Sequence, residues 1–210
     1  MVLAAVLCAT SSLLIASRAS PKAAAVPRAT TFACASDDSV VNVLETCRTE
    51  LCEDLSIPAA AQDEISSMLC LLHAEEVAPR IQEIYSQGTE EEERVVAIEE
   101  LSRKLDLLEE KAKGPLLSGS KPTIADAMLF PSFTLFELTL PSYFGWEEWT
   151  EEAIFYRRPR LHAWFELFSY ERAAKAAKKA VSDGVASLDL SAMAVEVPTS
   201  RKRKYPRHTS

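Results

Sequence analysis

The stretch that decides the fold of this chain is Gly114-Pro115-Leu116-Leu117-Ser118-Gly119-Ser120-Lys121-Pro122-Thr123-Ile124-Ala125-Asp126-Ala127-Met128-Leu129-Phe130-Pro131. It opens as a loop with Gly and Pro on both sides of two Leu residues, and it continues as a mostly apolar run. Thr123 and Asp126 have the spacing of a capping box. In this motif the Thr oxygen accepts a backbone N–H three residues on, and the acidic side chain accepts the backbone N–H of the Thr. The spacing therefore predicts a helix that begins after Thr123.

The residues after the predicted cap are apolar on nearly every side of the helix. They are Ala125, Ala127, Met128, Leu129, Phe130, Phe133, Leu135 and Phe136. A helix with no polar face belongs at the centre of a bundle. Because the start of a buried helix cannot use water, its cap must come from the protein itself.

Helical patterns flank this core helix on both sides. Residues 38–56 form an amphipathic pattern that ends at Ile57-Pro58, and residues 62–85 form a second one, in which Pro79 should kink or restart the helix. Residues 89–113 form a third, with Thr89 and Glu92 as a predicted capping box and Gly114 as the stop. With only 5 Gly and few β-branched segments, the chain is predicted to be all-α.

Two further helices are predicted after the core helix. Pro159 suits a first helical turn and is followed by a packing stripe of Leu161, Trp164, Phe165 and Phe168. Residues 171–181 form an Ala- and Lys-rich helix that is predicted to end at Gly184.

The loop and cap of residues 114–126 are similar to the C-terminal signature of the glutathione S-transferase superfamily, and residues 158–165 look like that family's next helix start. The resemblance implies an all-helical bundle of about five to six helices over residues 62–190. It also implies a structural, non-catalytic role for Thr123 and Asp126.

In that family a thioredoxin-like domain precedes the bundle and supplies the side chain that activates the glutathione thiol. Here we expect that domain to be missing, since only residues 37–61, a short helical extension, separate the presequence from the bundle. The sequence therefore predicts no catalytic residue, no metal ligands and no cofactor. Glutathione is expected as a ligand only if the transferase interpretation holds, and the residues that would bind it are unknown. In that case Cys47, Cys52 and Tyr85 are the first side chains to test.

Charge is distributed unevenly along the chain. Residues 1–36 contain no acidic residue and carry Arg18, Lys22 and Arg28, which is the chemistry of a signal- or transit-like presequence. We expect cleavage and a plastid (chloroplast) location, with a mitochondrion as the alternative. Residues 191–210 are predicted to be a disordered basic tail with possible peripheral contact to a membrane. Since the whole chain carries −8 and its two ends carry +3 and +5, residues 37–200 carry −16, which disfavours nucleic acid.

The cysteines show neither a CxxC pair nor zinc-site spacing, so Cys47, Cys52 and Cys70 are predicted to be free thiols. His162 is predicted to be an ordinary helix residue, and Trp146 and Trp149 are placed in an acidic, aromatic loop. No helix that spans a membrane is expected in the mature chain.

Three functions are compatible with these observations. The first is a non-catalytic protein-interaction or binding module in an organelle. Its interaction face would be the one normally covered by the thioredoxin-like domain, and residues 39–57, a partner or a second copy would cover it. The second is a glutathione S-transferase whose thioredoxin-like half is lost or lies on a separate chain. The third is a carrier of a hydrophobic ligand in an apolar cleft beside Met68, Leu72 and Tyr85.

Overall fold

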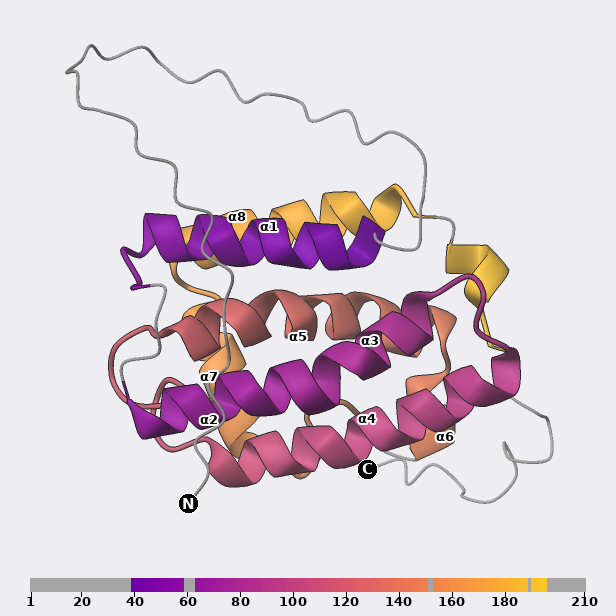
Figure 1. The fold of residues 1–210 in the computed structure, drawn as a ribbon, viewed down its shortest axis with the longest axis horizontal. Coiled ribbons are helices and arrows are strands. Elements are labelled where there is room, and N and C mark those ends of the chain that lie inside the picture. Colours follow the sequence, from indigo (N-terminus) through magenta and orange to yellow (C-terminus); the bar gives the residue numbers. More distant parts are fainter. Residues whose placement is uncertain (1–38, 59–62, 151–152, 189, 196–210) are drawn as a thin grey trace, which may run out of the picture. The chain divides into compact units, whose positions relative to one another are not determined.

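The computed structural model describes residues 39–58, 63–150, 153–188 and 190–195, which belong to one compact unit (Figure 1). Every element in these residues is helical, so the predicted all-α class is confirmed. The α-helices are α1 (Ser39–Asp54), α2 (Glu64–Leu72), α3 (Ala78–Tyr85), α4 (Glu91–Lys111), α5 (Ile124–Tyr143), α6 (Trp146–Thr150), α7 (Pro159–Phe168) and α8 (Arg172–Ala186). The predicted presequence, residues 1–36, lies outside the described residues.

Helices α2 and α3 form one continuous run through a π-helical turn, η1 (His73–Val77). The backbone N–H of Ala78 donates to the carbonyl oxygen of His73, five residues earlier. Pro79 then lies in the first turn of α3, where its missing N–H is tolerated. Of the two predicted effects of Pro79, a kink or a restart, the structure shows the restart: α3 begins at Ala78, after the π-helical turn. With α2–α3 taken as one run and the five-residue α6 set aside, the described residues contain six long helical segments. Five of them lie within residues 62–190, which agrees with the predicted number.

Helix α5 is the centre of the bundle. It packs against α1, α2, α6, α7 and α8, and most of its residues are buried. Figure 1 shows α1 and α8 running together along one side of α5, and α3 packs against α4 elsewhere in the bundle. The stripe predicted on α7, which comprises Leu161, Trp164, Phe165 and Phe168, is buried as expected.

The predicted capping box at Thr89 and Glu92 is wrong. Helix α4 begins at Glu91, its N-cap is Glu90, and no side chain caps it. The reason is the buried Arg94, whose guanidinium donates to the carbonyl oxygens of Thr89 at 3.1 Å and of Ser86 at 2.7 Å. The loop thus folds around this arginine instead of around the Thr89 hydroxyl.

Two glycines predicted to end helices have other roles. Helix α4 ends at Lys111, before Gly114, and a Cβ on Gly114 would lie 2.9 Å from the carbonyl oxygen of Gly119. Gly114 is therefore required by the tight loop that follows α4. Helix α8 continues past Gly184 to Ala186, and Gly184 serves a helix–helix contact described below.

A 3₁₀ turn, η2 (Leu190–Met193), crosses residue 191, where the predicted basic tail begins. Arg94 donates to the carbonyl oxygen of Met193 at 3.3 Å, and the N–H of Val195 donates to the carbonyl oxygen of Tyr143 at 3.2 Å. Residues 196–210 lie outside the described residues.

Helix α1 ends in a Schellman motif with an unusual residue at its left-handed position. The N–H of Ile57 donates to the carbonyl oxygen of Cys52 at 2.8 Å, and the N–H of Ser56 donates to that of Glu53 at 3.1 Å. Ser56 has φ 52°, a backbone conformation that usually falls to Gly at this position. The buried Ile57 supplies the apolar contact that accompanies this motif.

We expect Ser56→Gly to raise the free energy of unfolding by about 0.5 kcal/mol, since relief of the left-handed strain exceeds the extra entropy of Gly in the unfolded chain. Thermal and urea unfolding followed by circular dichroism measure this change. Thr49→Gly, at an exposed interior position of the same helix, is the matched control and should lower stability by about 0.3–0.5 kcal/mol, the difference in helix propensity between Thr and Gly. A loss of stability in Ser56→Gly would contradict the strain argument.

Candidate functional site

The capping box of α5 lies between Thr123 and Asp126. One carboxylate oxygen of Asp126 accepts the backbone N–H of Thr123 at 2.7 Å and the Thr123 hydroxyl at 2.8 Å. The Thr123 oxygen is also within 3.4 Å of the hydroxyl oxygen of Ser118 in the preceding loop. The capping box at the start of α5 is therefore formed entirely by protein groups.

Asp126 makes two further contacts that its position in the sequence does not reveal. Its other carboxylate oxygen accepts the indole N–H of Trp164 at 2.8 Å and the backbone N–H of Leu117 at 3.1 Å. One fully buried carboxyl group thus joins the loop after α4, the start of α5 and the middle of α7. The Leu-x-Gly loop and the Trp of α7 were both visible in the sequence, but their meeting at Asp126 depends on the tertiary fold.

Burial raises the pKa of Asp126 above its ordinary value, although the hydrogen bonds from Leu117, Thr123 and Trp164 act in the opposite direction. Because the pKa is raised in the folded state, the native fold favours the protonated form more than the unfolded chain does. The stability linked to this shift is present at low pH and is lost as the pH rises through the folded pKa. All the hydrogen bonds that this carboxyl group accepts come from Leu117, Thr123 and Trp164, so it has a structural role.

The three described thiols lie in positions unsuited to nucleophilic chemistry. Burial raises the pKa of Cys47 to about 11 and that of Cys70 to about 11, and it also raises the pKa of Cys52. The thiolate is the reactive form of cysteine, so raised values make these groups poor nucleophiles at neutral pH. All three thiols are free, in agreement with the prediction.

Tyr85 is a core residue, with its side chain 4% exposed. Its hydroxyl hydrogen-bonds to the hydroxyl of Thr139, and its ring meets Phe144 edge-on with centroids 5.3 Å apart. Burial raises the pKa of Tyr85 well above its ordinary value. The phenol therefore neither faces an open cleft nor ionises readily, in contrast to the role that the transferase interpretation would give it.

We expect Cys47 and Cys70 in the folded chain to react with iodoacetamide at pH 7.5 at least about 100-fold more slowly than in urea, since few thiolates form when burial raises the pKa. The rate should rise about tenfold per pH unit between pH 8 and 10. Peptide mapping by mass spectrometry assigns each labelled cysteine. Labelling of Cys47 at the rate of a free thiol would show that the site opens.

Two buried arginines complete the internal polar network. Arg158 precedes α7 and donates to the Asp106 carboxylate at 2.8 Å, to the Ile154 carbonyl oxygen at 2.6 Å and to the Ser102 hydroxyl at 2.9 Å. Arg94 holds the α3–α4 loop and η2, as described above. Both guanidinium groups bind backbone carbonyls inside the fold, so they are not available to an anionic ligand.

His73 lies at the π-helical turn and its Nε2 is 3.0 Å from the Ser132 hydroxyl oxygen of α5. Burial lowers its pKa to about 4, so it is neutral at physiological pH. His162 lies on α7, as predicted, and is exposed there, with Nε2 3.9 Å from a Glu166 carboxylate oxygen. Trp146 is buried and lies in the short helix α6, so the loop predicted at this position is wrong. The side chain of Trp149 lies outside the described part of the structure.

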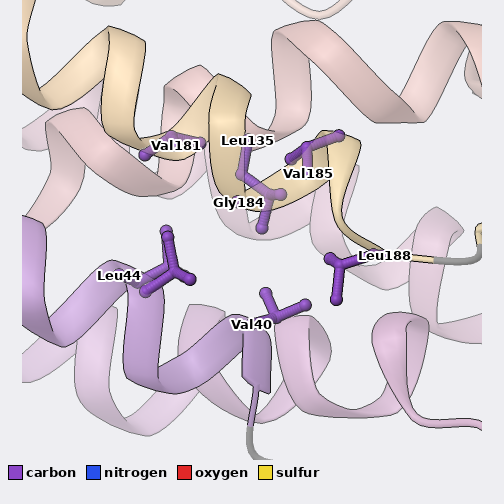
Figure 2. A pocket seen from close by; sticks show the side chains of 8 residues that line it. Val40, Leu44, Leu135, Val181, Gly184, Val185 and Leu188 are labelled. Carbon is purple, nitrogen blue, oxygen red and sulfur yellow. The ribbon is translucent and has the colours of Figure 1, made fainter. Parts of the chain in front are cut away.

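The most distinctive interface is the one that α1 makes with α5 and α8. A small apolar cavity of about 10 Å³ remains between these helices. Figure 2 shows side chains of α1 and α8 pointing toward one another across it, with Leu135 of α5 behind. The labelled residues that line it are Val40, Leu44, Leu135, Val181, Gly184, Val185 and Leu188. The cavity is too small for a metabolite.

A larger open groove lies on the outside of α3 and α4. It has a volume of about 560 Å³ and is lined by Arg80, Glu83, Thr89, Glu92, Glu93 and Val96. Arg80 is paired with Glu83 at 2.6 Å and with Glu100 at 2.8 Å. The helix dipole also stabilises the carboxylates in the first turn of α4. Their position is therefore explained by the stability of the helix, without a ligand.

Neither a metal-binding group nor a membrane span is found in the described part of the chain. No cluster of at least three His, Cys, Asp or Glu side chains there could hold a metal ion. Of the helices in those same residues, none has both the length and the hydropathy needed to cross a bilayer.

Comparison with known proteins gives one match. A family model described as "Glutathione S-transferase, C-terminal domain" matches residues 59–167, slightly more than half of the chain. The matched residues run from the segment before α2 into α7 and contain Thr123, Asp126 and Trp164, whereas α1 and α8 lie outside them. No curated protein and no solved structure gives a significant match.

Proposed function

Because this chain belongs to the glutathione S-transferase family through its C-terminal domain, we propose that it is a non-catalytic protein-interaction module that uses this helical bundle as its scaffold. One fold can carry enzymes and binding proteins alike, so family membership does not fix the function of this chain. The chemistry of its own side chains decides between them.

The side chains that could activate a thiol are buried or hard to ionise. Cys47 and Tyr85 are buried and have raised pKa values, and the pKa of Cys52 is raised as well. A group that stabilises or delivers a thiolate needs a lowered pKa or an adjacent base. These three positions, the first to consider for transferase chemistry, thus favour a structural role.

A second observation concerns the surface. Large apolar side chains are exposed on and beside α7, where Leu167 is 47% and Tyr170 is 73% exposed. Tyr156, before α7, is 52% exposed. Exposed tyrosines are common anchors of protein interfaces, because they bury a large ring and keep a polar tip. This supports a protein as the partner class.

The experiment is calorimetric titration of glutathione into the full chain, with a conjugation assay on the same sample using a chloronitroarene and glutathione. We expect neither heat of binding nor turnover. Cys47→Ser and Tyr85→Phe should then leave the background rate unchanged. Saturable binding with turnover lost in either variant would contradict the proposal.

The alternative function is glutathione conjugation, and the family match is the observation that favours it. In that case glutathione would be held by residues other than those described above, or with the help of a second polypeptide. Turnover that appears only when a thioredoxin-like protein is added would support this alternative over the interaction module.

We place the protein in an organelle, a plastid first and a mitochondrion second. The support is the composition of residues 1–36, which lack acidic residues and carry three basic ones. Imaging of a fluorescent protein fused behind residues 1–36 distinguishes the two. Diffuse fluorescence outside every organelle would count against both.

A further inference from the structure

The groove outside α3 and α4 is more acidic than the helix dipoles explain. Among the described residues that line it are three carboxylates and one guanidinium, so the formal charge of the lining is −2. Glu92 and Glu93 belong to the first turn of α4, where the helix dipole favours a negative charge. Glu83 lies in the last turn of α3, where the dipole favours a positive charge instead. The dipoles therefore account for two of the three carboxylates.

The groove also offers charges and apolar surface that the described residues do not use. Arg80, which lines it, already pairs with Glu83 at 2.6 Å. The carboxylates of Glu92 and Glu93 are exposed, and with the described residues they make neither an ion pair nor a hydrogen bond. The side chain of Val96, in the same lining, is 52% exposed. Lys and Arg side chains cover apolar surface with their stems and extend a charged end, so a basic segment fits this groove.

The last described residues before position 196 lie next to the groove. The guanidinium of Arg94 donates to the carbonyl oxygen of Met193 at 3.3 Å and to that of Thr89 at 3.1 Å. Thr89 itself lines the groove. Figure 1 shows the yellow turn η2 beside the segment that joins α3 to α4. One guanidinium group thus bridges η2 and the groove, and the chain continues from this point to position 196.

Basic residues follow within reach of the groove. Positions 196–210 contain one carboxylate, that of Glu196, and five cations, which are Arg201, Lys202, Arg203, Lys204 and Arg207. The six residues from position 196 to 201 can span up to about 20 Å when extended. The acidic groove and the basic segment are therefore complementary in charge and joined by a short stretch of chain.

We propose that the groove of α3 and α4 is the binding site for residues 201–207 of the same chain. Glu92 and Glu93 supply the unpaired negative charges, and Val96 supplies apolar surface for the stems of the basic side chains. The inference goes beyond the proposed function and does not depend on it. While the segment is bound, its cations are withheld from other anionic partners.

The tether makes a weak contact sufficient. Exposed ion pairs are individually weak, but a segment held by a short connection acts at an effective concentration on the order of millimolar. A groove that binds the free segment with a dissociation constant of about 0.1 mM is then occupied about nine-tenths of the time. Because the Debye length falls to about 3 Å in about 1 M salt, such a contact should be lost there.

The first test is carbodiimide cross-linking of the full chain, which joins a lysine amine to a neighbouring carboxylate, mapped by mass spectrometry. At low salt we expect Lys202 and Lys204 to cross-link to Glu83, Glu92 or Glu93 at least about fivefold more often than to exposed carboxylates elsewhere. At about 1 M salt these cross-links should fall at least about fivefold, because the charges are screened.

Two internal references make this result specific. The amine of Lys178 lies 2.8 Å from the carboxylate of Glu137, so this pair reports whether the cross-linking chemistry works at each salt concentration. A mixture of chains with light and heavy nitrogen separates cross-links within one chain from those between two chains. We expect the cross-links of the basic segment to lie within one chain.

The second test measures affinity with a fluorescent synthetic peptide of residues 196–210, followed by anisotropy. The receptor is the full chain with its own segment neutralised by Arg201→Gln, Lys202→Gln, Arg203→Gln and Lys204→Gln. We expect a dissociation constant of about 0.1 mM for this variant. The native chain should bind the peptide about tenfold more weakly, because its own segment competes for the groove.

Matched charge changes locate the binding site. In the neutralised chain, Glu92→Gln with Glu93→Gln should weaken peptide binding at least about fivefold. Glu50→Gln with Glu110→Gln removes the same number of negative charges from exposed positions outside the groove, and it should weaken binding less than about twofold.

Three results would overturn the proposal. The first is a spread of cross-links from Lys202 and Lys204 over exposed carboxylates without preference for the groove. The second is an equal loss of peptide affinity in the two pairs of substitutions, which would reduce the attraction to the overall charge of the chain. The third is cross-links only between different chains, which would make a second copy the partner. Glutathione turnover would contradict the proposed function and leave this inference untouched.

Discussion

Asp126→Ala is expected to lower the free energy of unfolding by at least about 3 kcal/mol. The substitution leaves the buried N–H groups of Leu117 and Trp164 without an acceptor, and each such loss costs about 1–3 kcal/mol. It also removes the cap of α5, which contributes about 1 kcal/mol. Urea unfolding followed by far-ultraviolet circular dichroism and Trp fluorescence measures the change.

Two companion variants separate the cap from the carboxyl group as a whole. Thr123→Ala removes only the hydroxyl partner and should cost about 1 kcal/mol. Asp126→Asn keeps one acceptor oxygen for Leu117 and Trp164 but turns an NH₂ group toward the Thr123 donors, so an intermediate loss is expected. Equal losses in Asp126→Ala and Thr123→Ala would contradict the role of Asp126 beyond the cap.

The pH dependence of the same variants follows from the raised pKa of Asp126. The unfolded carboxyl group titrates near its ordinary value of 3.8, and the folded one titrates at higher pH. Stability linked to this group is then present at low pH and lost as the pH rises. The native chain should therefore gain stability relative to Asp126→Asn as the pH falls from 7 toward 4.

The core of the fold could be predicted because its signals are local. The capping-box spacing, the apolar run after it and the stripe from Leu161 to Phe168 each lie within a few turns of one helix. Periodicity over such a window reports directly which face is buried. The placement of Pro79 followed in the same way from its missing N–H and its fixed backbone angle.

The errors arose where tertiary contacts override local preference. Thr89 lost its predicted cap role because the buried Arg94, five residues later, binds the carbonyl oxygens around it. Gly184 does not end α8, because its missing side chain admits Val43 of α1, which lies about 140 positions earlier in the chain. Likewise, no local pattern shows that Trp164 donates to Asp126, or that the thiol of Cys47 is buried under α8.

The other large loss is expected for Arg158→Ala, at about 3 kcal/mol. Arg158 is one of the largest fully buried side chains, and its guanidinium satisfies the Ile154 carbonyl oxygen and the Ser102 hydroxyl while it joins the segment before α7 to α4. Truncation leaves a cavity and unpaired acceptors, each of which destabilises the fold. Urea unfolding measures the loss, and intrinsic fluorescence reports whether the buried Trp146 and Trp164 remain packed.

The charge of Arg158 and its shape contribute unequally, and two variants distinguish them. Arg158→Met fills most of the volume without burying a charge, so it should recover about half of the loss. Arg158→Lys keeps the charge but cannot reproduce the planar set of donors that reaches Asp106, Ile154 and Ser102 together, so it should be no more stable than Arg158→Met. Because the Asp106 side chain is 59% exposed, Asp106→Asn should cost less than about 1 kcal/mol. A loss in Asp106→Asn as large as that in Arg158→Ala would mean that the ion pair, and not the hydrogen bonds to Ile154 and Ser102, holds α7 on α4.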